Sequence, residues 1–500
     1  MKFWESLSGT GSPSRSDPDR TSVLAVLTSL LVVAAALRLY RLDDGLWWDE
    51  IFMYVKFVKM PLAQLLTTYE SENQHFLYIL LARASIWIFG DTVWSLRFPA
   101  VLFGVGSIWA LYLLGRQVSG AREALLAAAL LTFSYHHIWF SQNARGYIGL
   151  LFWTILASWL FLRATGDARP KWWLLYAAAA ALGVYTHLFM IFVVIGHFII
   201  YVIGLKAQGR AAVPKRWVGF FVGFCLAGLF TVLLYAPILS QLLSYDPGTE
   251  SHAAVWKSPL WTLSEFIRGM EIGFAGGIGA MVVLLMFGAG LLSYARTNRV
   301  LIGLMVIPAL ICAAVVTGVG HHFWPRYFIF TMGFAALIFV RGAMQSADLL
   351  RHLFKLERIR PSWLGTTLLC TGIILASAAS VPSVYGPKQD YSAALLFVEA
   401  NQEPGDVVVT AGLAYFPYQK LYRKDWESVE TLDTLSTARS NAKRTWLLYT
   451  LSPQLETVFP EIMDAIRRDF KVIKQFPGTL GGGTIYVCRS DSPLRPSRQL

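Results

Sequence analysis

Two neighbouring carboxylates follow the first long apolar run of the chain and could do acid–base chemistry. Asp49 and Glu50 come directly after Trp47 and Trp48 in the stretch LWWDEIFMYVKF. A positioned carboxylate can remove the proton of a hydroxyl group as that group attacks an electrophile. The alternative is structural: Asp49 could cap a short interfacial helix, favoured by the helix dipole, with the tryptophans as anchors at the membrane surface.

Cationic side chains that could accompany this acidic pair come from several separate segments. They are His75, Arg97, Arg145, Arg326 and the histidines at 136, 137, 187, 321 and 322. Arginine offers bidentate donors to phosphate oxygens, so such a set could hold a phosphate group. A glycosidase needs two carboxylates because its leaving group is poor. A phosphate leaving group, with a second pKa of about 6, needs one base and several cations. Arg97 and Arg326 could instead be arginines that snorkel at helix ends.

The composition indicates a membrane protein. Of 500 residues, 55% are hydrophobic and 15% are charged, and the mean hydropathy is +0.50. These values are too apolar for an ordinary soluble protein. The net charge of +12 does not indicate nucleic-acid binding, because the basic residues stand in short clusters between apolar runs, where they act as topology signals. The four cysteines offer no disulfide framework and no C-x-x-C metal site.

Eleven apolar runs are predicted to be spanning helices, each of which needs about 20 residues. They begin near residues 22, 97, 123, 147, 172, 188, 217, 273, 300, 328 and 363. The first could also be the apolar part of a signal peptide, but the many spans that follow favour a retained anchor. The apolar segment 76–89 is too short to span and is predicted to be an interfacial helix.

The positive-inside rule assigns the basic loops and the N-terminal tail to the cytoplasmic side. Four polar segments then share the external face. They are the loop at 39–96, SQNARGY at 141–147, the loop at 237–272 and HHFWPRY at 321–327. The acidic pair and the cations are therefore predicted to face one compartment.

The chain is predicted to have three parts. Residues 1–21 are a Ser/Gly/Pro-rich disordered cytoplasmic tail, residues 22–383 are a transmembrane domain, and residues 384–500 are a soluble α/β domain. In the last part, the strands are predicted at DVVVT, TWLLYT, FKVIKQF and GTIYVCR, and a helix at PEIMDAIRRDF. Because the number of spans is odd, this domain is predicted to be external.

Four stretches, in this order, resemble the GT-C superfamily of polytopic glycosyltransferases. They are WWDE, ENQHFLYILLARASIWIFG, SLRFPAVLFGVGSIWALYLLGRQVSG and HHIWFSQNARGYIGLL. The nearest branch looks like the bacterial relatives of protein O-mannosyltransferases and lipid A aminoarabinose transferases. Residues 22–165 carry most of the resemblance, and WPRYF and the α/β tail add weaker agreement.

The resemblance implies roles for particular residues. Asp49 would be the catalytic base, with Glu50 as its catalytic neighbour. The residues implied to bind the donor phosphate are His75, Arg97, Arg145, Tyr147, Arg326 and Tyr327. Two departures stand out: HFLY lacks both prolines of the family's His-Pro-Pro-Leu stretch, and YIGLLF lacks an aspartate that many relatives carry. A mechanism that needs two separated aspartates is therefore disfavoured.

A divalent metal is an open possibility, since some GT-C enzymes use one and others do not. The candidate ligands are Asp49, His75, His321 and His322, whose side chains are of types that bind Zn²⁺ and similar ions. Their spacing in the sequence does not decide whether they converge.

The predicted function is an inverting hexosyl- or pentosyltransferase in a bacterial cytoplasmic (inner) membrane. It would move a sugar from a polyprenyl-phosphate donor to a glycolipid, glycan or protein acceptor at the outer face. The alternatives are a flippase or transporter of lipid-linked sugars and an O-antigen ligase or polymerase. A transporter would carry polar residues near the bilayer midplane, often within inverted repeats. Here the polar residues fall in external loops and no repeat is visible.

Overall fold

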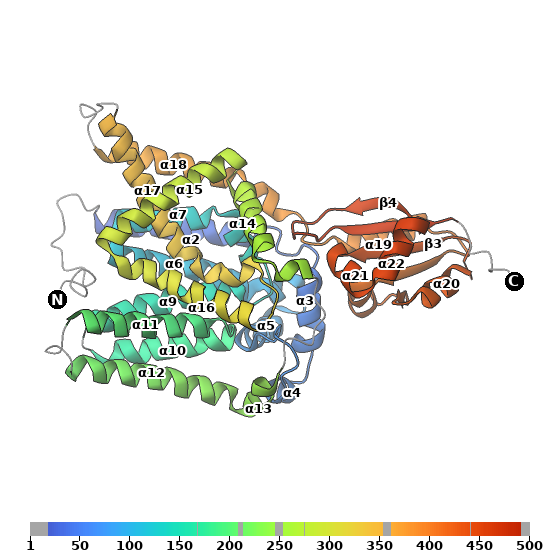
Figure 1. The fold of residues 1–500 in the computed structure, drawn as a ribbon, viewed down its shortest axis with the longest axis horizontal. Coiled ribbons are helices and arrows are strands. Elements are labelled where there is room, and N and C mark those ends of the chain that lie inside the picture. The colour runs from blue at the N-terminus through green and yellow to red at the C-terminus, as the bar shows by residue number, and fades with distance from the viewer. Residues whose placement is uncertain are drawn as a thin grey trace.

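The computed structural model describes residues 19–167, 169–208, 214–245, 254–274, 276–353, 362–440 and 442–491. Most of the described chain forms a bundle of long helices, and a small α/β unit stands beyond one end of it (Figure 1). Most of the predicted tail at 1–21 lies outside the described residues.

The first half of the bundle contains long helices and several short ones. Its elements are α2 (Arg20–Leu39), α3 (Trp48–Met53), the π-helix η1 (Tyr54–Val58), α4 (Leu62–Thr67), α5 (Phe76–Phe89), α6 (Val93–Ser119), α7 (Ala121–Thr132), α8 (Tyr135–Ser141), α9 (Tyr147–Gly166) and α10 (Pro170–Thr186). The first of these, α2, begins two residues before the predicted run because the carboxylate of Asp19 caps it, accepting from the backbone N–H groups of Thr21 and Ser22.

The second half continues the bundle to its last span. Its elements are α11 (Met190–Gln208), α12 (Pro214–Tyr235), η3 (Ala236–Ile238), α13 (Leu239–Ser244), η5 (Ala254–Lys257), α14 (Pro259–Gly273), α15 (Gly277–Thr297), α16 (Arg299–Gly318), η6 (Pro325–Thr331), α17 (Met332–Leu353), α18 (Ser362–Ala379) and η8 (Val381–Tyr385).

Eight helices in the described part of the chain are long and apolar enough to cross a membrane, and a ninth span results if α7 and α8 count as one. Each of the eleven predicted runs contains a helix, but α10 has only 17 residues and the apolar part of α11 is Met190–Gly204. At 1.5 Å per residue, 17 residues cover about 26 Å, less than the roughly 30 Å of a bilayer's hydrocarbon core. The segment 76–89 forms a helix of 14 residues, α5.

The α/β unit follows η8. Its elements are α19 (Tyr391–Asn401), β1 (Val407–Ala411), η9 (Gly412–Ala414), η10 (Pro417–Leu421), β2 (Glu427–Val429), α20 (Leu432–Ser440), β3 (Thr445–Thr450), α21 (Ser452–Val458), α22 (Pro460–Asp469), β4 (Lys471–Phe476) and β5 (Ile485–Ser490).

The strands of this unit form one mixed sheet in the order β2-β1-β3-β5-β4. Strand β1 is parallel to β2 and β3, whereas β5 is antiparallel to β3 and β4. All six residues of β3 are buried, because both faces of this central strand are covered. A continuous apolar run such as TWLLYT is typical of such a strand. The three-residue edge strand β2 was not predicted.

The span that begins near residue 123 is broken rather than continuous. Helices α7 and α8 meet at an angle of 64°. The buried guanidinium of Arg38 on α2 donates to the carbonyls of Leu131 and Thr132, at 3.1 and 3.2 Å, and Arg38 also contacts His137 at 2.7 Å. At the break these carbonyls lose their regular i→i+4 helical hydrogen bonds, and Arg38 supplies donors in their place. Such replacement donors allow a helix to be broken inside a bundle.

We expect Arg38→Leu to destabilise the protein by about 2–5 kcal/mol, because the carbonyls of the broken helix would lose buried donors. Thermal unfolding of the detergent-purified chain would measure this, with Arg41→Leu as the control, since the Arg41 side chain is about half exposed. Equal melting temperatures for both variants would contradict the capping role of Arg38.

Candidate active site

A cavity of about 620 Å³ lies at the end of the bundle that carries the α/β unit. Its wall comes from α3, the segment before α5, the turn between α10 and α11, and the chain around residues 319–327. The α/β unit contributes Leu413, Leu451, Gln454, Leu480 and Gly481. A concave, largely apolar site of this size with a few polar groups is typical of small-ligand binding.

Asp49 lies in the cavity wall between two arginines. Its Oδ2 atom is 3.1 Å from Nη1 of Arg145 and 3.3 Å from Nη1 of Arg326. The side chains of Asp49 and Arg145 are 12% and 2% exposed. Two guanidinium groups face one carboxylate, so the cluster carries an excess positive charge. The cluster is therefore suited to an anion.

The arginines also hold donor atoms that the protein itself does not use. Among the described residues, Nε of Arg145 and Nε of Arg326 are buried and have no hydrogen-bond partner. Buried donors without partners are costly and are normally satisfied by water or a ligand. Aromatic faces hold the guanidinium groups in place: Arg145 lies 5.5 Å from the ring centroid of Tyr147, and Arg326 lies 4.6 Å from that of Trp324.

His75 also lines the cavity, where its ring stacks on that of His187 with centroids 4.7 Å apart. Burial and the nearby cations hold the pKa of His75 well below its usual value, and the same causes lower the pKa of His187 to about 3. Both rings are therefore neutral near pH 7.

The neutral state fixes what His75 can bind. One ring nitrogen of His75 donates to the backbone carbonyl of Thr186, and Nε2 has no partner within the described chain. In a neutral imidazole one nitrogen donates and the other accepts, so Nε2 is an acceptor. This differs from the expected phosphate contact, because a phosphate oxygen needs a donor.

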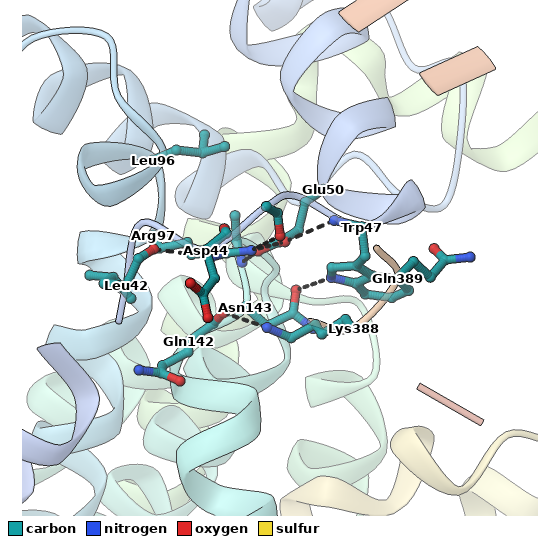
Figure 2. Close-up of polar contacts among 12 residues, drawn as sticks. Leu42, Asp44, Trp47, Glu50, Leu96, Arg97, Gln142, Asn143, Lys388 and Gln389 are labelled. Carbon is teal, nitrogen blue, oxygen red and sulfur yellow. Dashed lines mark hydrogen bonds and ion pairs between the residues drawn. The ribbon is translucent and has the colours of Figure 1, made fainter. Parts of the chain in front are cut away.

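Glu50 and Arg97 form a buried ion pair beside the cavity rather than in it (Figure 2). Nε and Nη2 of Arg97 donate to the two carboxylate oxygens of Glu50 at 2.8 and 2.6 Å. The remaining Arg97 N–H groups donate to the carbonyls of Leu42, Asp44 and Gly45. Both side chains are almost completely buried. The sequence analysis expected Glu50 and Arg97 to touch substrate, but neither lines the cavity.

The Glu50–Arg97 pair instead fixes the residues beside it. Oε1 of Glu50 accepts the backbone N–H of Ala144 at 2.6 Å. Glu50 is next to Asp49 in the chain, and Ala144 is next to Arg145. The Glu50 carboxylate therefore joins the segment that carries Asp49 to the segment that carries Arg145. Burial raises the pKa of Glu50, but the charge and hydrogen bonds of Arg97 outweigh burial and leave it lowered. Glu50 is therefore ionised, as this pairing requires.

Lys388 and Gln389, just before the α/β unit, complete the support. Nζ of Lys388 donates to the carbonyl of Gln142 at 2.9 Å, and the Gln389 side chain accepts the backbone N–H of Trp48 at 2.9 Å. Burial lowers the pKa of Lys388 to about 7. Neither residue was predicted from the sequence. The available signal was a lysine directly after the last span, on the side predicted to be external, where the positive-inside rule disfavours it.

Asp49 does not cap its helix. Trp47 occupies the N-cap position of α3, and Asp49 lies in the first turn. Nε1 of Trp47 donates to Asn143 at 3.2 Å, so this tryptophan ties α3 to the Arg145 segment. The carboxylate of Asp49 is therefore available to the cavity.

The candidate metal ligands do not converge on one point. His321 contacts Glu72 at 2.7 Å, and Nε2 of His322 contacts the hydroxyl of Tyr327 at 2.5 Å. Over the described ranges, no group of three or more His, Cys, Asp or Glu side chains is placed to hold a metal ion. The residues as placed do not fit a protein-bound metal, and no chemical step below passes through one.

Comparisons with known proteins agree with this architecture. A family model described as "Dolichyl-phosphate-mannose-protein mannosyltransferase" matches residues 74–240. Two Bacillus subtilis proteins that carry mannosyltransferase names, YycA and YkcB, are 27% and 25% identical over 33% and 31% of this chain. The match spans about a fifth of the length of these relatives, 22% and 21%.

Solved structures share the fold at low sequence identity. ArnT from Cupriavidus metallidurans has a TM-score of 0.55 at 12% identity, covering 95% of this chain and 100% of that one. The oligosaccharyltransferase of Archaeoglobus fulgidus has a TM-score of 0.54 at 13% identity, covering 87% of this chain and 70% of that one. This multi-pass membrane chain is therefore similar to the matched mannosyltransferase family over residues 74–240, and it shares the fold of ArnT and of the archaeal oligosaccharyltransferase.

Proposed function

We propose that this chain is an inverting glycosyltransferase that uses a polyprenyl-phosphate sugar donor. It transfers a hexosyl or pentosyl group to a hydroxyl of a glycolipid, glycan or protein at the outer face of a bacterial cytoplasmic membrane. The observation that carries this proposal is the meeting of one carboxylate, Asp49, with two arginines in one cavity. ArnT solved with undecaprenyl phosphate and the archaeal oligosaccharyltransferase AglB solved with a dolichol-phosphate support the donor class.

In the proposed reaction, the donor phosphate accepts hydrogen bonds from the unused N–H groups of Arg145 and Arg326. The acceptor hydroxyl attacks the anomeric carbon from the face opposite the phosphate, and its proton passes to the carboxylate of Asp49. A new carbon–oxygen bond forms as the bond to the phosphate oxygen breaks. The arginines stabilise the negative charge that stays on the departing polyprenyl phosphate. Attack from the opposite face inverts the anomeric centre.

The apolar part of the cavity suits the lipid portion of such a donor. It is lined by Leu188, just before α11, by Phe192 in its first turn, and by Val315 and Val319 at the C-terminal end of α16. Val315 and Val319 are exposed, so this wall continues onto the outer surface of the bundle. The positive-inside rule places the cavity and the α/β unit on the non-cytoplasmic side. A lipid carries the donor sugar to that side.

We expect Asp49→Asn to lower the transfer rate about 10²–10⁴-fold, because an amide cannot take the acceptor proton. Transfer from a polyprenyl-phosphate sugar by the purified protein in nanodiscs measures the rate, and binding of bare undecaprenyl phosphate checks that the cavity remains intact. Asp91→Asn is the matched control, since Asp91 pairs with Lys59 away from the cavity. Full activity of Asp49→Asn would remove Asp49 from the role of base.

We expect Arg97→Lys and Glu50→Gln to lower the melting temperature and the transfer rate, while the affinity of the folded fraction for undecaprenyl phosphate falls by much less than the transfer rate does. The physical reason is that the buried pair positions Asp49 and Arg145 and does not touch the phosphate, and breaking such a pair costs about 3–5 kcal/mol. Differential scanning fluorimetry and lipid-phosphate titration separate the two effects. A large loss of phosphate affinity at unchanged stability would show that Arg97 binds the donor directly.

A further inference from the structure

The cavity contains hydrogen-bond acceptors that the proposed transfer does not use. Glu72 lines the cavity wall, and its side chain is 34% exposed, the most open of the two acidic side chains there. Its Oε1 atom is 2.7 Å from Nε2 of His321. Asp49 already faces two guanidinium groups, whereas Glu72 is paired with this imidazole and lies close enough to Arg326 for their charges to interact.

The position of Glu72 is well supported from both sides. Its neighbour Asn73 accepts a hydrogen bond from Nη2 of Arg145 at 2.6 Å, which ties the Glu72 segment to the phosphate-binding arginine. On the other side, Nδ1 of His321 contacts the carbonyl of His322 at 3.2 Å, and the two imidazole rings lie 3.8 Å apart. The imidazole therefore holds the Glu72 carboxylate in one orientation at the cavity.

The chemistry of this carboxylate excludes the phosphate and selects another part of the ligand. An ionised carboxylate accepts hydrogen bonds and donates none, so it repels a phosphate and attracts hydroxyl donors. His75 offers a second acceptor of the same kind. Its Nε2 is buried in the cavity wall without a partner among the described residues, because its other ring nitrogen is engaged by Thr186. The cavity thus combines arginine donors with two acceptors.

We propose that Glu72 and His75 form a hydroxyl-binding subsite that recognises the sugar rather than the phosphate of the ligand. Glu72 and Nε2 of His75 each accept a hydrogen bond from a sugar hydroxyl, and His321 is a positioning residue for Glu72. This subsite determines which glycosyl group or which acceptor hydroxyl is admitted. The inference rests on the proposed function, but hydroxyl recognition can be measured without turnover.

The test uses full-length protein in nanodiscs with the variants Glu72→Gln and His75→Phe. The glutamine keeps the size of the side chain but loses its charge, and the phenylalanine keeps a ring to stack on His187 but loses the acceptor. Glu70→Gln is the control, because Glu70 is exposed two residues away and lies outside the cavity wall. Tryptophan fluorescence reports binding, since Trp47, Trp48, Trp256 and Trp324 line the cavity.

Three ligands separate the subsites: undecaprenyl phosphate, its hexose- and pentose-linked forms, and methyl glycosides. A hydrogen bond to a charged acceptor is worth about 1.5–3 kcal/mol, so we expect Glu72→Gln to weaken sugar binding roughly 10- to 100-fold. Undecaprenyl phosphate should bind this variant as it binds wild type. In a transfer assay, a rise in donor KM assigns the subsite to the donor sugar, and a rise in acceptor KM assigns it to the acceptor. Either rise supports hydroxyl recognition.

Two results would overturn the inference. One is equal affinity of wild type, Glu72→Gln and His75→Phe for every sugar-containing ligand. The other is an equal loss of affinity for undecaprenyl phosphate and for its sugar-linked form, which would make Glu72 a support of the phosphate site. Failure of wild type to bind any lipid phosphate would count against the proposed function instead. The methyl glycoside titration would still decide whether Glu72 and His75 bind hydroxyl groups.

Discussion

The ion pair between Glu50 and Arg97 is the interaction on which the candidate site depends. The pair is buried, and both side chains also form hydrogen bonds with the backbone. Arg97 donates to three carbonyls of the loop before α3, and Glu50 accepts from the N–H of Ala144. A buried charge pair with all its hydrogen bonds made fixes geometry more than it adds stability. Here it fixes the distance between the peptide that carries Asp49 and the peptide that carries Arg145.

The charge pattern of the cavity follows from that geometry. Asp49 and the two arginines form a cluster with an excess positive charge and spare donors, and the Glu72 carboxylate beside it is paired with an imidazole. The cavity therefore holds arginine donors next to carboxylate and imidazole acceptors, and both signs of charge come from short polar segments between apolar helices. The histidines beside this cluster are neutral because burial and the two arginines lower their pKa. A ligand that carries both an anionic group and hydroxyl groups matches this combination of donors and acceptors.

Each apolar run in the sequence predicted a helix that the structure contains, because long apolar runs are strong signals. The predicted number of spans was less accurate, since eight helices in the described chain, or nine with the bent pair, are long enough to cross a membrane. The sequence also predicted that Asp49, Arg145 and Arg326 come from segments on one face, and the structure brings them together. The sequence did not show that Arg97 has a different role from the other arginines, because its pairing with Glu50 is known only from the three-dimensional structure. Glu72, Lys388 and Gln389 were missed for the same reason: their roles arise from contacts with residues hundreds of positions away in the chain.

The cavity wall runs from Trp47, near the start of the chain, to Gly481, near its end. During synthesis the Asp49 segment leaves the ribosome first, and its last partners follow roughly 20–90 s later at about 5–20 residues per second. Until then, Glu50 and Arg97 can pair, but the hydrogen bonds of Gln389 to Trp48 and of Lys388 to Gln142 cannot yet form. The pocket is closed only after the chain has been made past Gly481, so a product that ends earlier, or that is half inserted, carries the acid and the arginines without the complete cavity wall around them.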